Sequence, residues 1–227
     1  MSSSNRETRW SLVTRAQGDT PDARLALSEL CEIYYAPVLS YIRASSGPDE
    51  AADLTHAFFE RILSGDSLKG ASRERGRFRS YLLGAAKHFL CETRSKEQRQ
   101  KRGRHFPHLD FQDETSGDDS TPPPDAEFDR AWACTLIDHA LHRLGDEMER
   151  SGKAVLFQTL LPWLTGAATH GDQAATAATL GLSETAVRVQ VHRMRKRFRE
   201  LIEAEVAQTL EADADPVAEL RHLLSAC

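Results

Sequence analysis

Apolar residues along most of this chain recur every three or four positions, which is the spacing of one face of an α-helix. No stretch alternates apolar and polar residues as a half-buried strand does, and no internal repeat occurs. The pattern therefore predicts an all-α fold. The expected helices cover residues 23–44, 48–63, 78–95, 127–148, 157–164, 172–180, 183–210 and 217–224, with a short helix near residue 10.

Basic and acidic residues are separated along the chain, although the net charge is only −5. From Lys69 to Arg104 there are twelve Lys or Arg residues and three acids. From His105 to Asp129 there are eight acids and no Lys or Arg. Within that acidic stretch, residues 115–125 contain no apolar residue except proline, so they cannot build a core. The charge pattern is typical of basic contact surfaces joined by an acidic connector.

Residues 172–199 form the most specific pattern, with two helical segments meeting at Leu180-Gly181-Leu182. Gly181 can adopt the left-handed conformation that ends a helix, and Ser183 is a favourable N-cap for the next one. The second segment has one apolar face and an opposite face that is largely basic. A short helix, a tight turn and a longer helix with a basic outer face predict a helix-turn-helix motif.

The outer face of this second helix carries the side chains expected to enter a DNA major groove. They are Thr185, Arg188, Val189, His192, Arg193 and Lys196. Arg188 and Arg193 can pair with guanine edges or phosphates, and Val189 can contact a thymine methyl group. A solvated amphipathic helix is the plainer interpretation. The coincidence of turn, cap and basic run favours DNA recognition.

The remaining composition favours a cytoplasmic protein without an active site. Cys31, Cys91, Cys134 and Cys227 are far apart and form no CxxC pair, which is typical of reduced thiols. No apolar run approaches membrane-spanning length, and the first residues lack the apolar core of a signal peptide. We find no nucleophile–base motif, phosphate loop or zinc-protease signature. His88 and Cys91 supply only two ligands, too few to close a zinc site. We therefore expect neither catalysis nor a bound metal or cofactor.

The order of these parts resembles that of the extracytoplasmic-function (ECF) sigma factors, the smallest members of the bacterial sigma-70 family. The resemblance covers residues 10–224 and is carried by four motifs. ADLTHAFFER at 52–61 is similar to Asp-Leu-x-Gln-Glu-x-Phe of the family, and FRSYL at 78–82 is similar to Phe-x-x-Trp-Leu. LGLSETAVR at 180–188 resembles Leu-Gly-Ile-Ser-x-Gly-Thr-Val-Lys, and HRMRKRFR at 192–199 resembles His-Arg-Ala-Arg-x-x-Leu-Arg. Each motif alone is weak, and their order at family spacing makes the match specific.

The resemblance implies a promoter-specificity subunit that binds core RNA polymerase and places two readers on promoter DNA. Residues 10–104 would form a sigma region 2-like helical domain that binds the polymerase and the melted −10 element. Residues 105–126 would form an acidic, Pro-rich, flexible linker. Residues 127–227 would form a region 4-like domain whose helix-turn-helix reads the −35 duplex, followed by a short C-terminal helix.

The resemblance also assigns residues to the surfaces of the first domain. A melted strand needs a basic track for its backbone and a pocket for an extruded base. The expected −10 residues are Arg73, Arg75, Arg77, Ser80, Lys87, His88 and Arg94. The expected polymerase-binding residues are Glu50, Asp53, Leu54, His56, Phe59 and Glu60. Gly84, in mid-helix, costs about 1 kcal/mol relative to alanine and indicates either close approach of another backbone or a packing requirement. For the −10 set, a solvated basic face is the plainer interpretation.

The polymerase-binding motif departs from the family pattern. Ala52, His56 and Ala57 stand where Glu, Gln and Glu are common, so this face is short of acids. One hypothesis is that phosphorylation of Thr55 restores negative charge to the middle of the face. The alternative, which we favour, is that hydrophobic contacts compensate for the missing acids. At His88 the family often has Asn, a change that bears on promoter sequence.

A conventional helix-turn-helix transcriptional regulator is the alternative function. Such a regulator would bind duplex DNA alone, often as a dimer on a palindrome. A sigma factor is expected to be a monomer when free and to bind promoter DNA poorly without polymerase. The resemblance leaves room for an inhibitory partner or a kinase, and the residues identify neither.

Overall fold

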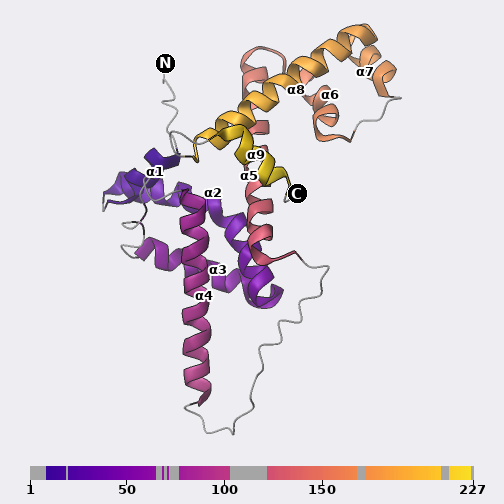
Figure 1. The fold of residues 1–227 in the computed structure, drawn as a ribbon. Helices are drawn as coiled ribbons and strands as arrows, with labels where there is room; N and C mark the ends of the chain where they lie inside the picture. The colour runs from indigo at the N-terminus through magenta and orange to yellow at the C-terminus, as the bar shows by residue number, and fades with distance from the viewer. Residues whose placement is uncertain are drawn as a thin grey trace. The chain divides into compact units, whose positions relative to one another are not determined.

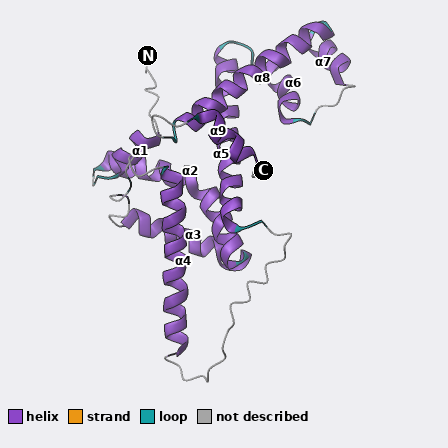
Figure 2. Ribbon diagram, in the orientation of Figure 1, coloured by secondary structure: helices purple, strands orange, loops and turns teal. Residues whose placement is uncertain are grey.

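The computed structural model describes residues 9–18, 20–64, 68, 71, 77–102, 122–167, 172–210 and 215–225. Within these residues the regular elements are all helices, which confirms the expected all-α class for this part of the chain (Figure 1; Figure 2). The helices are α1 (Arg9–Ala16), α2 (Pro21–Ser46), α3 (Pro48–Ser64), α4 (Phe78–Arg102), α5 (Pro124–Arg150), α6 (Ala154–Thr165), α7 (Asp172–Leu180), α8 (Glu184–Ala207) and α9 (Pro216–Ser225). None of these helices is long and apolar enough to cross a membrane.

Several helix ends differ from the sequence-based expectation by a few residues, and two of these differences bear on the charged segments. α4 continues through the basic run to Arg102, beyond the point near residue 95 where we expected it to end. α5 begins at Pro124, so residues 124–126, which we expected in the linker, are helical. Proline is favoured in the first helical turn because its missing N–H needs no partner there, and Asp125 and Glu127 suit the positive end of the helix dipole. Residues 105–121 of the expected linker lie outside the described residues.

The chain divides into two compact units, each with its own core. Unit 1 comprises residues 1–135 and 208–227, and unit 2 comprises residues 136–207. The first part of α5 and the whole of α9 therefore group with α1–α4, which differs from the domain bounds expected above. Burial explains the grouping, because Trp132 of α5 and Leu223 of α9 are 0% and 1% exposed.

An aromatic cluster forms the centre of unit 1. Phe78, the first residue of α4, contacts Trp10 and Tyr34 edge to face, with ring centroids 6.0 and 5.2 Å apart. The other face of the cluster is a parallel stack of Tyr34 on Trp132, with centroids 4.6 Å apart. Aromatic pairs in these geometries contribute about 0.5–1.5 kcal/mol beyond the burial of their area. The cluster joins α1, α2, α4 and α5, and so fixes where α4 begins.

The core of unit 2 is largely aliphatic, with Phe157 among its members, and is drawn from the second part of α5 and from α6, α7 and α8. Leu144, Leu160 and Val187 come from three of these helices and are at most 1% exposed. Gly145 faces the ring of Phe157, because a Cβ built there would lie 3.2 Å from its Cε1 atom. This core holds α8 by one face and leaves the opposite face in solvent.

Candidate nucleic-acid interface

The turn between α7 and α8 has the geometry that the sequence predicts. Gly181 has φ +63°, in the left-handed region. Its amide donates to the Ala178 carbonyl at 3.3 Å, and the amide of Leu182 donates to the Ala177 carbonyl at 3.0 Å. These bonds satisfy carbonyls that the end of a helix leaves without partners. The Ser183 hydroxyl accepts the amide of Ala186 at 3.2 Å and caps α8.

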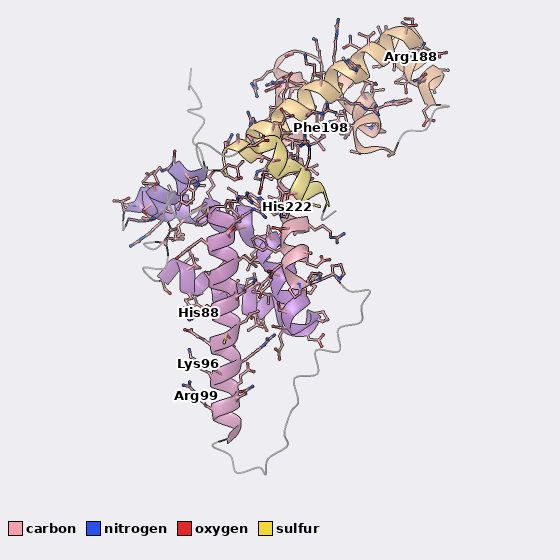
Figure 3. All side chains as sticks on the ribbon, viewed as in Figure 1. His88, Lys96, Arg99, Arg188, Phe198 and His222 are labelled. Atoms are coloured by element: carbon pink, nitrogen blue, oxygen red, sulfur yellow. The ribbon has the colours of Figure 1, made fainter. Side chains whose placement is uncertain are left out.

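Helix α8 is amphipathic as expected. Val187, Val191 and Met194 are buried at 0%, 8% and 4% exposure. The outer face of α8 consists of the six side chains expected to contact DNA, and all are exposed: Thr185, Arg188, Val189, His192, Arg193 and Lys196. Figure 3 shows Arg188 on α8 near the end that adjoins α7. Val189 is 43% exposed, which leaves an apolar side chain in solvent among basic neighbours.

Two arginines of the same basic run serve unit 2 itself. Arg195 donates from Nε and Nη2 to the Trp163 carbonyl at 3.2 and 2.7 Å, which fastens the end of α6 to α8. Arg197 forms a two-bond pair with Glu147 of α5, at 2.8 Å for each bond. The hydrogen bonds from Arg197 hold the pKa of Glu147 below its usual value. The basic run that begins at His192 therefore contains two kinds of cation. Arg193 and Lys196 are exposed on the outer face, whereas Arg195 and Arg197 bond to other helices of unit 2.

A partly buried ion pair also links α5 to α8. Arg143 donates to Glu205 at 2.5 Å, and Glu205 is only 5% exposed. Removing one partner of a buried pair leaves an uncompensated charge. The pair therefore fixes which face of α8 turns inward. Arg143 and Glu205 are 62 positions apart, so no local pattern in the sequence pairs them.

The exposed face of α4 carries most of the expected −10 residues. Ser80, Lys87, His88 and Arg94 are exposed, and Arg77 is half-buried. Arg73 and Arg75 lie outside the described residues. From residue 91 to residue 99 no side chain is buried, and Figure 1 shows this half of α4 extending beyond α3. His88, Lys96 and Arg99 are spaced along α4, and Lys96 and Arg99 lie on this extension (Figure 3).

Two of the exposed α4 cations have partners on other helices of unit 1. The Lys87 ammonium lies 2.6 Å from Asp125 at the start of α5. The Arg94 guanidinium donates to the carbonyl of Ser45, near the end of α2. Both α4 side chains remain largely in solvent, where such pairs contribute about 0–1 kcal/mol and are screened by salt. A phosphate could replace either partner at little cost.

Glu92 has two basic partners beside it on the α4 surface. Its carboxylate accepts a hydrogen bond from Arg61 of α3, and it lies 3.3 Å from the Nδ1 atom of His88. The hydrogen bond from Arg61 holds the pKa of Glu92 below its usual value.

An open pocket of about 440 Å³ lies between α3 and α4. Its walls are Phe58, Arg61, Ile62, Ser80, Tyr81, Gly84, Ala85, His88 and Phe89. Among the described residues nothing lies within 4 Å of a Cβ built on Gly84, so no described backbone approaches it closely. Of the two explanations expected for this glycine, close approach is wrong. Gly84 instead leaves the pocket wall open. The pKa of Tyr81 is raised by partial burial, so its hydroxyl stays protonated and can donate a hydrogen bond.

A set of ion pairs that sequence reasoning missed lies at the amino-terminal end of α4. We call Arg77, Arg79, Asp129 and Glu219 the α4–α9 ion-pair cluster. Glu219 of α9 accepts from Arg77 Nη1 and Arg79 Nη2, each at 2.7 Å. Arg79 also donates through Nη1 to Asp129 of α5. Both Arg79 and Glu219 are buried, at 6% and 4% exposure.

A second hollow, the α2/α3 groove, holds part of the expected polymerase-binding set. The groove has a volume of about 560 Å³. Its walls are Ser28, Cys31, Glu32, Tyr35, His56, Phe59, Glu60 and Leu63. The Tyr35 hydroxyl and the Nε2 atom of His56 are 3.0 Å apart, and Leu63 is 51% exposed. Burial raises the pKa of the Cys31 thiol to about 11, so it is a neutral wall of the groove.

The other expected polymerase-binding residues take different positions on α3. Phe59 is 7% exposed and stacks on Tyr35, so it forms a wall of the α2/α3 groove and little free surface. Leu54 is half-buried, whereas Glu50 and Asp53 are exposed. α3 therefore contributes one wall of the α2/α3 groove and also carries these exposed carboxylates, so its surface is both apolar and acidic.

Thr55 does not lie on the exposed face of α3, where the phosphorylation hypothesis placed it. Its side chain is 0% exposed, and its hydroxyl donates to the Ala51 carbonyl at 2.7 Å. Burial with a satisfied hydroxyl makes Thr55 a core residue. A kinase could reach it only if α3 opened locally.

No family model matches the chain, and no curated protein or solved structure matches it either. Among the described residues, no three His, Cys, Asp or Glu side chains gather in a way that could hold a metal ion.

Proposed function

We propose that this protein is a promoter-specificity subunit of bacterial RNA polymerase, similar in function to ECF sigma factors. The observation that carries the proposal is the helix-turn-helix of α7 and α8. Its turn at Gly181 is closed by backbone hydrogen bonds, and the expected DNA-contacting side chains of α8 are all exposed. Such a helix can enter a major groove, where each base pair presents a distinct set of donors, acceptors and methyl groups.

The outer face of α8 offers chemistry for both base and phosphate contacts. Arg188 and Arg193 can form two-bond contacts with guanine, and the exposed Val189 can pack on a thymine methyl group. His192 and Lys196 lie further along the same face and suit phosphates. Because Arg195 and Arg197 are held by Trp163 and Glu147, they would position α8 and not read sequence.

The α4 face and the α3/α4 pocket support a second contact, with a melted strand. Cations spaced along α4 can follow a phosphate backbone. The pocket of about 440 Å³ falls within the range of about 300–1,000 Å³ that is typical of small-ligand sites. Tyr81 offers an aromatic ring and a hydroxyl donor, and Ser80 and His88 offer polar edges. This combination suits a base taken out of the stack.

The α2/α3 groove supports docking on the polymerase. Tyr35, Phe59 and Leu63 make it apolar, and Glu32 and Glu60 add negative charge. An amphipathic helix with basic flanks would fit such a groove. This arrangement agrees with the hypothesis that apolar contacts compensate for the acids missing from α3.

The decisive experiment is run-off transcription with purified bacterial core polymerase on genomic fragments, with and without the full-length chain. We expect discrete transcripts only when the chain is present, and we expect Arg193→Ala to weaken them. Lys153→Ala is the matched control, because it removes an exposed cation of unit 2 that lies outside α8. If the chain never associates with polymerase but binds duplex DNA alone as a dimer, the conventional regulator is correct.

A further inference from the structure

We propose that α9 is a displaceable cover whose Glu219 carboxylate occupies the place of a nucleic-acid phosphate at the start of α4. The inference rests on the proposed function, because it concerns regulation of the same strand-binding face. In this arrangement the free protein holds its strand-binding face partly neutralised by its own C-terminal helix. A strand of nucleic acid must displace α9 to reach Arg77 and Arg79.

The contacts of Glu219 are those that a phosphate would make. Its two oxygens divide between Arg77 and Arg79, with both N–O distances at 2.7 Å. Arginine forks bind carboxylates and phosphates with the same paired geometry. Arg77 was expected from the sequence to contact the melted strand, and its side chain is still 39% exposed. A strand that follows α4 towards its first turn would therefore meet an arginine whose partner is a carboxylate.

Further along α4, a second carboxylate pairs with a cation that was expected to contact the strand. Asp125 of α5 neutralises Lys87, as Glu219 neutralises Arg77. Two cations expected to contact the strand thus face carboxylates from segments outside α1–α4. An acidic side chain that pairs with a nucleic-acid-binding cation competes with phosphate for that cation, since both cannot occupy one site.

The burial pattern of α9 favours an exchange, in which a phosphate takes the place of Glu219 as α9 leaves, over release of α9 alone. Glu219 and Leu223 of α9 are buried, whereas Val217, Ala218, Arg221 and His222 are exposed. Undocking without an anion would remove one of the two carboxylates that neutralise Arg79, and it would also remove the Glu219 carboxylate from Arg77. An arriving phosphate restores the lost neutralisation. Docking of α9 and binding of a polyanion should therefore oppose each other, and by linkage each weakens the other equally.

The existing network leaves room for this exchange. The Nε atom of Arg79 is buried, and no hydrogen-bond partner for it occurs among the described residues. His222 lies 3.6 Å from Asp129 and is 60% exposed, so this one pair is largely in solvent. The Glu219 carboxylate and the buried Leu223 are thus two attachments of α9. Each can be weakened separately.

The test measures binding of the full-length chain to a fluorescein-labelled single-stranded DNA by anisotropy at low salt. The variants are Glu219→Gln, which keeps the shape and removes the charge, and Leu223→Ala, which weakens docking and keeps every charge. Glu149→Gln is the matched control, because Glu149 is an exposed acid in unit 2. We expect both α9 variants to bind at least about fivefold more tightly than the wild type, the lower end of typical coupling between sites. The control should bind like the wild type.

Hydrogen–deuterium exchange provides the second readout. Adding the same oligonucleotide to the wild-type chain should speed exchange of the amides in residues 216–225. If neither α9 variant binds more tightly and α9 exchange is unchanged by DNA, the cover does not exist. An unfolded Leu223→Ala variant would leave Glu219→Gln and the exchange measurement to decide.

The transcription experiment separates this inference from the proposed function. If the wild type directs transcription while the α9 variants bind single strands no better, only the cover is refuted. If the wild type never works with polymerase but Leu223→Ala binds single strands more tightly, the cover survives and the sigma role fails.

Discussion

Arg193 and Arg197 are four residues apart on α8, and the structure gives them different tasks. Arg193 is exposed, whereas Arg197 is tied to Glu147 by two hydrogen bonds of 2.8 Å. We predict that Arg193→Ala weakens binding of the polymerase complex to a −35 duplex by about 1–3 kcal/mol, as expected for loss of a base contact. That corresponds to roughly 5- to 150-fold in the dissociation constant. The melting temperature of the Arg193→Ala variant should stay at the wild-type value.

Arg197→Ala should show the reverse pattern. Its side chain is 42% exposed and that of Glu147 is 27% exposed, so water screens much of the attraction. Because the pair has two parallel hydrogen bonds, its contribution lies at the upper end of the range for exposed ion pairs. We therefore expect Arg197→Ala to lower the free energy of unfolding by about 1 kcal/mol. For a unit of 60–100 residues this lowers the melting temperature by about 4–8 °C. DNA binding, measured well below that temperature, should change by less than about threefold, in line with a non-reading residue.

The pH dependence of the Arg197→Ala effect gives an independent check. Pairing with Arg197 lowers the pKa of Glu147 in the folded state. The pair therefore stabilises fully above the unfolded pKa of about 4.3, and its contribution is lost as the pH falls through the lowered folded value. Calorimetry should show wild type and Arg197→Ala converging in acid. The reasoning is refuted if Arg197→Ala reduces DNA affinity as much as Arg193→Ala while the melting temperature stays unchanged.

Three further predictions address single positions. Gly84→Ala should raise the free energy of unfolding of unit 1 by about 1 kcal/mol, because the added Cβ meets nothing among the described residues. It should also weaken single-strand binding, because the Cβ narrows the α3/α4 pocket. Denaturant unfolding tests the first effect and anisotropy the second, and a lower free energy of unfolding would contradict the first. Thr55→Glu should destabilise unit 1 by several kcal/mol, since it buries a charge at a 0% exposed site, while Thr55→Val should be far milder; a soluble, stable Thr55→Glu chain with stronger polymerase binding would instead support the phosphorylation hypothesis. Leu160→Ala should cost about 2–5 kcal/mol in urea unfolding of unit 2, and a loss below 1 kcal/mol would mean that the core there is poorly packed.

The helix-turn-helix could be predicted from sequence because its determinants are local. Gly181, Ser183 and the apolar stripe of α8 lie within a few turns of one another, and their bonds close inside the motif. The α4–α9 ion-pair cluster has no such signal. Arg79 and Glu219 are separated by 140 positions, and nothing in a charge pattern pairs residues so distant.

Thr55 shows a signal that was present and misread. It lies four residues after Ala51 and three before Phe58, both buried, so the helical period places it on the inner face. Its polarity suggested the outer face, but a threonine in a helix can satisfy its hydroxyl on the carbonyl four residues earlier. The α3/α4 pocket, by contrast, needs the packing of two helices, and only its residue types could be foreseen.

The stack of Tyr34 on Trp132 has a practical consequence for dissecting the molecule. A fragment cut where the basic run ends, near residue 104, would lack Trp132 and leave one face of the Tyr34 ring bare. Losing a buried tryptophan typically costs about 3–5 kcal/mol, a large part of the stability of a small domain. Recombinant pieces of the amino-terminal half should therefore retain the first turns of α5, and shorter ones will be prone to aggregate.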